Sequence, residues 1–417
     1  MAQLSDDCFA FGGTLLAVEE AAARMAAHVP PVRETEAVGL ADALGRVVAN
    51  DVRTKIPLPP FDNSAVDGYA VRHADLAASG ETRLRIVGRS QAGSRTEAVG
   101  AGQAIRIFTG APMPEGADTV FMQEDCRVEG ETVILPAGLK PGANRRLRGE
   151  DIAAGAVALP AGRRLGPEDV ALTAAIGCTE IEVRRRPRVA VFSTGDEIVE
   201  PGKPLGASAL YDANRYLLLA LLRGMGAEAH DLGILKDDPA ALTPALAAAA
   251  EGHDLILTSG GVSTGEADHV KAAVEQVGKL VLWRLAIKPG RPVAMGVVRG
   301  TAFAGLPGNP VAVFVTFVHV VRPLIQRLAG AEVVSASALP VRAAFQYKKK
   351  KGRREYVRVG LRRGADGVIE AVKHPQDGAG VLTSLTETDG LAELLEDRVE
   401  VEPGSTVGFL SYAALVG

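Results

Sequence analysis

Five polar, glycine-rich segments stand out because each follows a predicted strand between residues 188 and 309. They cover residues 193–197, 236–238, 259–268, 288–291 and 307–309. In open α/β sheets, ligands bind outside the carboxyl ends of the strands. Connecting loops are polar in most proteins, but here glycines and charges coincide on loops that should share one edge. The pattern therefore predicts a binding site at that edge.

The segment 260–265 has the composition of an anion-binding loop. Gly260 and Gly261 allow backbone N–H groups to approach a phosphate closely, and Ser263 lies in the same loop. A helix predicted to follow would add its positive N-terminal end. The segment matches neither GxGxxG nor GxxxxGK[ST], which disfavours a dinucleotide oxidoreductase or a Walker-type ATPase.

Lys288 and Arg291 lie three residues apart on a loop stiffened by proline and glycine. Such a pair can hold an oxyanion, because arginine contacts two oxygens at once and lysine supplies a point charge. Two solvated surface cations are the alternative interpretation.

Carboxylates would lie close to this basic pair. Glu197, Asp237 and Asp268 follow three different strands, and hard oxygen ligands beside phosphate-binding groups suit Mg²⁺. One of them could instead orient a water for attack on phosphorus. Asp238 precedes a proline and has the pattern of a helix cap, and capping remains an alternative for Asp268.

Two further candidates lie in a β-rich region nearer the N-terminus. Asp67 belongs to the turn-forming stretch 59–71, for which a purely structural turn is the alternative, and Thr109 offers a hydroxyl donor. The basic run 348–354 lies between two predicted strands. We interpret it as a solvated hairpin tip rather than a nucleic-acid patch.

Composition narrows the class of protein. The chain has 417 residues, is 47% hydrophobic and carries 46 basic against 50 acidic side chains, for a net charge of −4. The hydrophobic fraction excludes a chain that is disordered throughout. The small negative net charge gives no sign of overall attraction to nucleic acid or an anionic membrane. Three scattered cysteines disfavour a disulfide framework or a structural zinc site. No secretory signal is evident and the longest apolar run is 311–318, so we expect a cytoplasmic protein with no membrane segment.

The elements that must position these residues follow from periodicity. Helical spacing is found at 15–28, more weakly at 40–48, and at 167–175, and short β-type runs separated by turns fill about 57–155. From 188 to 330, strands alternate with helices, which predicts a mostly parallel sheet covered on both faces. After 330 the pattern is β-type again and predicts a small barrel or sandwich.

Seven motifs, in register over nearly the whole chain, resemble those of the molybdopterin molybdenumtransferases, the MoeA family, which also includes the gephyrin E domain. They are Phe61-Asp-Asn-Ser-Ala-Val-Asp-Gly-Tyr-Ala70, Thr109-Gly-Ala-Pro-Met-Pro-Glu-Gly-Ala-Asp118, Arg148-Gly-Glu-Asp151, Ser193-Thr-Gly-Asp-Glu197, Ser259-Gly-Gly-Val-Ser263, Lys288-Pro-Gly-Arg-Pro292 and Leu306-Pro-Gly-Asn-Pro310.

The resemblance implies a multi-domain α/β plus β fold. Residues 1–185 would form an elongated helical and β-rich N-terminal region of two subdomains. Residues 186–330 would form a three-layer α/β molybdopterin-binding domain, and residues 331–417 a small C-terminal β-barrel.

The activity implied is insertion of molybdenum from molybdate into adenylylated molybdopterin, with Mg²⁺-dependent release of AMP. The resemblance also implies a homodimer whose active site joins the α/β domain of one subunit to the β-rich region of the other. Other proteins of molybdenum cofactor biosynthesis are further expected partners.

By motif position, the functional acids fall on Asp67, Glu197, Asp237 and Asp268, of which the last three are expected Mg²⁺ ligands. The expected substrate-binding residues are Thr109, Gly260, Gly261, Ser263, Lys288, Arg291, Pro307, Asn309 and Arg358.

Three positions depart from the family pattern. Arg291 stands where lysine is usual, and Ala312 and Ala379 stand where serine is common. The two lost hydroxyls would each remove about 0.5–1.5 kcal/mol of hydrogen bonding, which bears on the choice between molybdate and tungstate. A tungstate-using paralogue and a molybdopterin-binding scaffold without turnover are the alternatives. The related molybdopterin adenylyltransferases resemble only the α/β segment.

Overall fold

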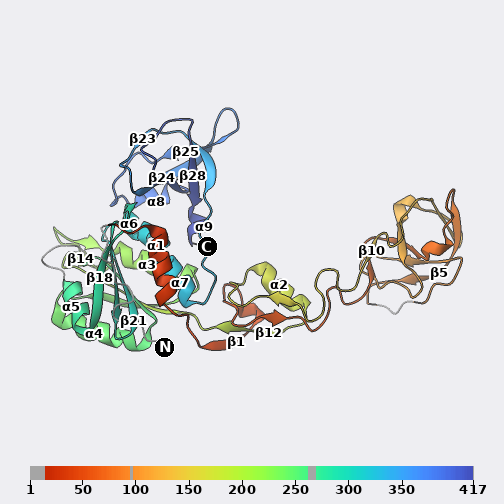
Figure 1. Cartoon of the computed structure of the whole chain (residues 1–417), viewed down its shortest axis with the longest axis horizontal. Coiled ribbons are helices and arrows are strands. Elements are labelled where there is room, and N and C mark those ends of the chain that lie inside the picture. The colour runs from red at the N-terminus through yellow and green to blue at the C-terminus, as the bar shows by residue number, and fades with distance from the viewer. Residues whose placement is uncertain (1–14, 94–96, 262–268, 417) are drawn as a thin grey trace.

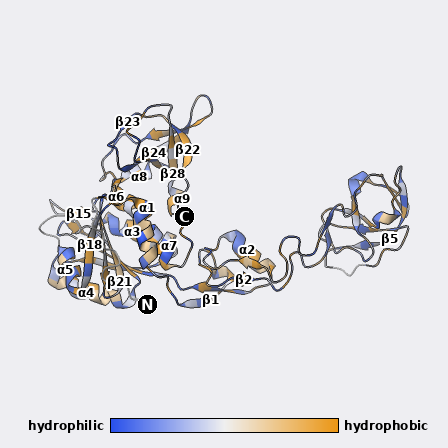
Figure 2. Cartoon of the chain, viewed as in Figure 1, coloured by the Kyte–Doolittle hydropathy of each residue, from blue (hydrophilic) through white to orange (hydrophobic). Residues whose placement is uncertain are grey.

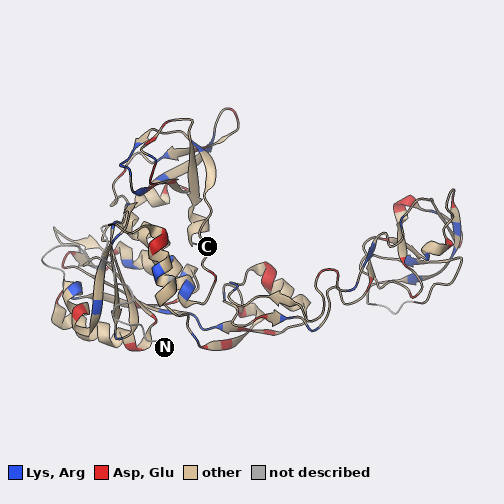
Figure 3. Ribbon diagram, viewed as in Figure 1, with Lys and Arg blue, Asp and Glu red and all other residues tan. Residues whose placement is uncertain are grey.

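The computed structural model describes residues 15–93, 97–261 and 269–416. These residues form an α/β domain, a barrel beside it, a narrow middle unit and a β-rich unit at the far end (Figure 1). Acidic and basic side chains are spread along the whole molecule (Figure 3), in keeping with the balanced composition.

The α/β domain is built on a six-stranded sheet with the order β16-β13-β17-β21-β20-β18. Strands β16, β13, β17 and β21 are parallel, β20 is antiparallel to β21, and β18 is antiparallel to β20. The strands are β13 (Arg188–Thr194), β16 (Glu228–Leu235), β17 (Leu255–Ser259), β18 (Gly278–Arg284), β20 (Pro292–Val298) and β21 (Thr301–Leu306). The predicted mostly parallel sheet is confirmed.

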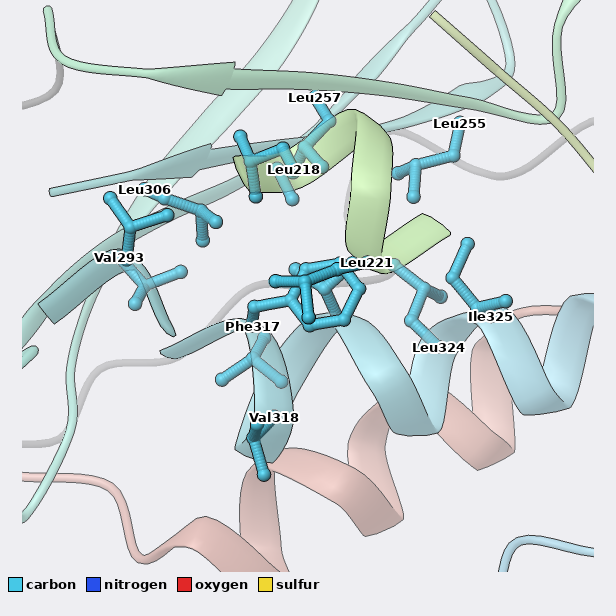
Figure 4. Close-up of a cluster of buried hydrophobic side chains, with 14 of the residues drawn as sticks. Leu218, Leu221, Leu255, Leu257, Val293, Leu306, Phe317, Val318, Leu324 and Ile325 are labelled. Atoms are coloured by element: carbon cyan, nitrogen blue, oxygen red, sulfur yellow. The ribbon is translucent and has the colours of Figure 1, made fainter. Parts of the chain in front are cut away.

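Helices cover both faces of this sheet because successive strand residues point to opposite sides. On one side Val189 and Val191 pack with Leu218 of α3 (Ala213–Gly224); on the other, Ala190 and Phe192 pack with α4 (Pro239–Gly252) and α5 (His269–Val277). Figure 4 shows the first cluster, in which leucines of α3 and β17 meet Phe317, Leu324 and Ile325.

The helix that carries these last residues is continuous from α6 (Pro310–Thr316) through a π-helical turn (Phe317–Val321) to α7 (Arg322–Leu328). By length and composition alone, Pro310–Leu328 is long and apolar enough to cross a membrane. However, 78% of its most apolar window is buried inside the protein, so packing in the core accounts for its composition.

Helices such as α1, α4 and α7 carry both apolar and polar residues (Figure 2).

The N-terminal helix is α1 (Val18–His28), as the sequence predicts, and it packs on the helix 310–328. The weaker helix predicted at 40–48 is wrong. Residues Thr35–Gly39 form strand β1, and only Leu40–Asp42 make a helical turn, of the 3₁₀ type. Gly45 then adopts a φ of +73°, and Val48 bridges to Val183, so pairing with a distant segment replaces the helix.

The middle unit consists of two strand pairs and helix α2 (Pro167–Ala175). Strand β1 pairs with β12 (Glu180–Arg184), and β2 (Val52–Arg53) pairs with β11 (Val157–Leu159). The chain therefore passes through this unit twice, once on the way to the far unit and once on the way back.

The far unit is a six-stranded sheet with the order β7-β4-β6-β5-β9-β8 around its own core. Its strands are β4 (Gly68–Val71), β5 (Thr82–Ser90), β6 (Gln103–Ile107), β7 (Thr119–Met122), β8 (Arg127–Glu129) and β9 (Thr132–Leu135). The strands predicted from the β-type runs are confirmed.

The C-terminal unit is a closed barrel, since β24 pairs with both β25 and β26 and the order β24-β25-β22-β28-β26 returns to its start. This arrangement decides between the barrel and the sandwich. The strands are β22 (Leu339–Ala343), β24 (Arg354–Arg363), β25 (Ile369–Lys373), β26 (Gly390–Leu394) and β28 (Thr406–Ser411).

The basic run 348–354 is only partly the solvated tip that we predicted. It joins β23 (Tyr347–Lys348) to β24, but Lys349 is buried, and its Nζ donates to the carbonyl oxygen of Arg353 at 2.7 Å. A buried ammonium requires such acceptors, so this lysine belongs to the loop structure rather than to its surface.

Phe317→Ala should destabilise the α/β domain by about 3–5 kcal/mol, because a fully buried aromatic ring leaves a cavity in the largest core. Urea unfolding followed by fluorescence checks this, since Trp283 is the only tryptophan and lies in the same core. Leu44→Ala, at an exposed side chain of the middle unit, is the control and should change the midpoint little. Equal midpoints for both variants would contradict the packing described here.

Candidate functional site

The carboxyl ends of five strands meet at one edge of the α/β sheet. Strands β16, β13, β17 and β21 are parallel and β18 runs in the same direction, so the loops that follow them share this edge, which we call the rim. The residue pairs Thr194–Leu235 and Ser193–Ser259 place the loops bearing Glu197, Asp237 and Gly260 on neighbouring strands. The predicted clustering of the polar loops is confirmed.

Polar oxygens at the rim are buried without a hydrogen-bond partner among the described residues. They are Ser193 Oγ, Thr194 Oγ1, Thr258 Oγ1 and Asp237 Oδ1. A buried polar group left unpaired costs about 1–3 kcal/mol, so each needs a reason to persist. A ligand at the carboxyl ends of β13, β16 and β17 would supply the missing partners.

The two glycines predicted to cradle an anion do adopt unusual backbone conformations. Gly260 has a φ of +88° and Gly261 a φ of +65°. A Cβ on Gly261 would lie 2.6 Å from Val270 Cγ2, so only glycine fits the close approach to α5. Ser263, in the same loop, lies outside the described residues.

A side chain that the sequence interpretation missed holds two rim loops together. Asn214 Nδ2 donates to Ser259 Oγ at 2.9 Å and to the carbonyl oxygen of Gly308 at 2.7 Å. Ser259 Oγ in turn donates to the carbonyl oxygen of Pro307 at 3.0 Å. The loops after β17 and β21 are thereby fixed to the first turn of α3. Asn214 is the second residue of α3, and no local signal distinguishes it from other polar residues at the start of a helix.

The sequence interpretation also missed Arg215, which binds three acidic side chains near the rim. It is 2% exposed and donates to Asp212 at 2.8 Å, to Asp231 at 2.5 Å and to Glu200. Glu200 lies in the loop that follows β13, and Asp231 lies in β16. This network holds the loop of Glu197 against the neighbouring strand.

Glu197 and Asp237 are the two predicted acids that the structure describes at the rim; Asp268 lies outside the described residues. Glu197 is exposed, and Asp237 is partly buried. Within the described ranges, no three histidine, cysteine or acidic side chains gather closely enough to hold a metal ion by themselves. The neighbouring Asp238 does cap α4, accepting from the backbone N–H of Ala240 at 3.3 Å, as predicted.

A cavity of about 360 Å³ lies where the rim meets the C-terminal barrel. It brings together five predicted binding residues: Lys288, Arg291, Pro307, Asn309 and Arg358. The remaining lining residues include Ala312, Tyr347, Tyr356, Asp377 and Ala379. Three cationic side chains from two domains thus surround a space large enough for a tetrahedral oxyanion and part of a larger ligand.

Lys288 is held by two residues of the barrel region. Its Nζ donates to Tyr347 Oη at 3.1 Å and to Glu355 Oε2 at 3.3 Å. Partial burial works against the charged form, but the hydrogen bond to Tyr347 and the charge of Glu355 raise the pKa of Lys288 above its ordinary value. The ammonium is therefore fully charged at neutral pH.

Arg358 is almost fully buried and shapes the opposite wall of the cavity. Its Nε donates to Ser384 Oγ, and its Nη2 donates to the carbonyl oxygens of Gln376 and Gly378, each at 3.1 Å. These bonds fold the loop 376–379 against the guanidinium. Ser384, Tyr347 and Glu355 are site residues that the sequence interpretation did not single out.

Asp67 and Thr109 contact each other at the far unit. The backbone N–H and the hydroxyl of Thr109 both donate to Asp67 Oδ1, each at 2.8 Å. These bonds, the backbone one first, hold the pKa of Asp67 below its ordinary value. The partners are 42 residues apart, so the bond joins two loops and is not a local turn.

The structure does not bring this pair to the rim of its own chain. Figure 1 places the far unit at one end of the molecule and the α/β domain at the other, with the middle unit between them. Within one chain, Asp67 and Thr109 therefore belong to a different surface from the cavity.

Three family models match successive parts of the chain. Residues 16–177 match the MoeA N-terminal region (domain I and II), residues 190–327 a probable molybdopterin binding domain, and residues 340–412 the MoeA C-terminal region (domain IV).

Known relatives match the chain over nearly its full length. A molybdopterin molybdenumtransferase of Haemophilus influenzae is 39% identical over 97% of this chain and 100% of its own length, and one of a Nostoc species is 38% identical over 90% and 88%. A molybdopterin biosynthesis moeA protein from Pyrococcus horikoshii superposes with a TM-score of 0.80 at 29% identity, covering 96% of this chain and 100% of its own. With this fold and these matches, the chain belongs to the molybdopterin molybdenumtransferase (MoeA) family.

Proposed function

We propose that this protein catalyses molybdenum insertion in the biosynthesis of the molybdenum cofactor. It would take molybdenum from molybdate, transfer it to adenylylated molybdopterin and release AMP. The observation that carries the proposal is the cavity in which Lys288, Arg291 and Arg358 converge next to the rim. Two cations on one stiff loop can hold a tetrahedral dianion, with Arg291 contacting two oxygens and Lys288 a third.

The rim loops would bind the phosphates of the adenylylated substrate. Gly260 and Gly261 directly follow the carboxyl end of β17 and have left-handed backbone conformations. The unpaired hydroxyls at the ends of β13 and β17 belong to Ser193, Thr194 and Thr258. Backbone N–H groups and hydroxyls are suitable donors for phosphate oxygens. This placement would set the dithiolene end of the substrate toward the cavity.

The residues at the rim fit Mg²⁺ as a cofactor. Asp237 has an unpaired buried carboxylate oxygen and Glu197 lies on the loop after the adjacent strand, and hard oxygen ligands of this kind suit Mg²⁺ together with substrate phosphates. Asp268 would join them by its place in the sequence. Mg²⁺ would neutralise charge on the phosphates while the anhydride bond is broken. The carboxylate not engaged with the ion would orient the attacking water.

The complete site would require a homodimer working in the cytoplasm. Asp67 and Thr109 are far from the rim of their own chain, and the far unit is carried on an extended middle unit, so a second subunit could present its pair to the rim. In this arrangement each active site uses residues of both chains. Other proteins of the same biosynthetic route would deliver the substrate and receive the product.

Tungstate is the competing oxyanion, and one observation makes it worth testing. Ala312 and Ala379 line the cavity and offer no hydroxyl to the anion. A scaffold that binds molybdopterin without turnover is the competing class of function.

Purified protein with adenylylated molybdopterin and Mg²⁺ should release AMP and load metal when molybdate is added. AMP release only with tungstate would identify the paralogue, and tight pterin binding without turnover on either anion would identify the scaffold.

Asp237→Asn should lower the rate of AMP release by about 100-fold or more, because a neutral amide cannot replace a carboxylate toward a metal ion or a water. The matched control is Asp238→Asn, since asparagine also caps helices and this side chain caps α4. The control should keep its activity. Equal losses in both variants, or none in Asp237→Asn, would remove Asp237 from the proposed mechanism.

Mixing two inactive variants tests the shared site. Asp67→Asn and Lys288→Ala should each be inactive alone, but a heterodimer would combine one intact far unit with one intact rim. Co-refolding equal amounts should restore about a quarter of the wild-type sites, because half of the dimers are mixed and each has one complete site. Activity that stays at the level of the single variants would place both residues in the same chain's site or rule out the dimer.

A further inference from the structure

The strand that carries Lys288 pairs with the C-terminal barrel and not with the sheet of its own domain. Strand β19 (Ile287–Lys288) is parallel to β24, with Ile287 opposite Arg354 and Lys288 opposite Glu355. The lysine of the cavity therefore takes its position from the barrel. A change in the pairing of β19 with β24 would therefore change the position of Lys288 in the cavity.

Glu355 is placed to fix the Lys288 side chain. It is 1% exposed, and its two oxygens accept from three donors. Oε2 accepts from Tyr347 Oη at 2.8 Å and from Lys288 Nζ at 3.3 Å, while Oε1 accepts from Arg353 Nε at 2.7 Å. A carboxylate buried this deeply persists only when its charge is compensated, and these three donors compensate it.

Tyr347 links this carboxylate to the cavity. Its hydroxyl accepts from Lys288 Nζ and donates to Glu355, and the residue also lines the cavity wall. The hydroxyl has one proton, which is committed to Glu355, so its lone pairs face the ammonium. Lys288 is thereby held by two acceptors on one side, and its third N–H remains for a ligand.

We propose that Glu355, acting with Tyr347, is a positioning residue that holds the Lys288 ammonium in place in the cavity for oxyanion binding. This inference rests on the proposed function for the oxyanion, but the contacts themselves do not. Glu355 belongs to the barrel and is not among the residues that line the cavity, so it acts on the cavity through Lys288.

The charged groups around Lys288 determine whether loss of the Glu355 charge raises or lowers the pKa of Lys288. From its own loop it faces Arg291, and from the barrel side Arg358, Asp377, Tyr347 and Glu355. The cations Arg291 and Arg358 favour loss of its proton, and Asp377 is paired with Lys373 at 2.7 Å. Glu355 is the carboxylate in direct contact, so removing its charge must lower the pKa of Lys288.

The test is the pH dependence of Lys288 acetylation by a trace of acetic anhydride, read by peptide mass spectrometry. In Glu355→Gln the midpoint should fall by about one pH unit, because the lysine side chain is 47% exposed and water screens the charge of the carboxylate 3.3 Å away. Tyr347→Phe should shift it in the same direction by less, and it carries the test if Glu355→Gln fails to fold. An unchanged midpoint in both variants overturns the proposal.

Glu393→Gln is the matched control, since Glu393 is a partly buried barrel carboxylate that contacts Arg354 at 3.3 Å and not Lys288. Its midpoint should equal that of the wild type. An equal shift in this control would mean that the effect is a general response of the barrel, which also overturns the proposal.

Calorimetric titration with molybdate and with tungstate gives the second readout. The wild type should keep nearly all of its affinity between pH 7 and pH 9.5, whereas Glu355→Gln should lose up to about twofold at the higher pH as Lys288 begins to deprotonate. Equal pH profiles for the two proteins contradict the positioning role. If the acetylation midpoint shifts but the wild type binds neither anion, the proposed function fails and the contacts to Lys288 stand.

Discussion

The direction of the strands in one sheet is the constraint on which the site depends. Four parallel strands, with β18 running the same way, bring the ends of segments that are more than 100 residues apart to one edge. The buried hydroxyls of Ser193, Thr194 and Thr258 are a consequence, because strands covered on both faces have polar ends only where something else can satisfy them. The core beneath is formed by apolar side chains on both faces, so the polar side chains of the site lie at the strand ends and in the rim loops.

The site also depends on how the barrel is attached to the α/β domain. A two-residue strand of the α/β domain pairs with β24, and the backbone N–H of Val311 at the start of α6 donates to the carbonyl oxygen of Ala379 at 3.0 Å. The cavity lies between these two attachments. Arg358 and Lys288 thus face each other across a boundary between domains, and neither domain alone could form the site.

Local signals in the sequence predicted the elements well where the determining residues are neighbours. Asp238 before Pro239 marks the start of α4, and alternating strands and helices from 188 to 330 give the layered sheet. The helix predicted at 40–48 failed because Val48 bridges to Val183, some 135 residues later, and no local pattern reports that pairing. The glycine-rich loops and the Lys288–Arg291 pair were visible as candidates because their chemistry is local.

The supporting residues of the site could not be predicted in the same way. Asn214, Arg215, Tyr347, Glu355 and Ser384 act through contacts with residues that are remote in sequence or belong to another element. Arg215 looks like any charged residue of an amphipathic helix, and Glu355 looks like a polar position on an edge strand. Only their burial in the folded chain gives them a role.

The state of Asp67 limits what the far unit can contribute to a shared site. Two hydrogen bonds from Thr109 to the same oxygen lower the pKa of this carboxyl, so it is ionised at neutral pH and cannot act as a general acid. An ionised carboxylate also repels phosphate, which makes contact with the phosphates of the substrate unfavourable. Among the residues that the structure describes, nothing donates to its second oxygen, which could accept from an N–H donor or approach a cation. In the proposed dimer, Asp67 would therefore be suited to accept from the amino groups of a pterin or to approach a metal ion, while the substrate phosphates would bind to the rim loops of the other chain.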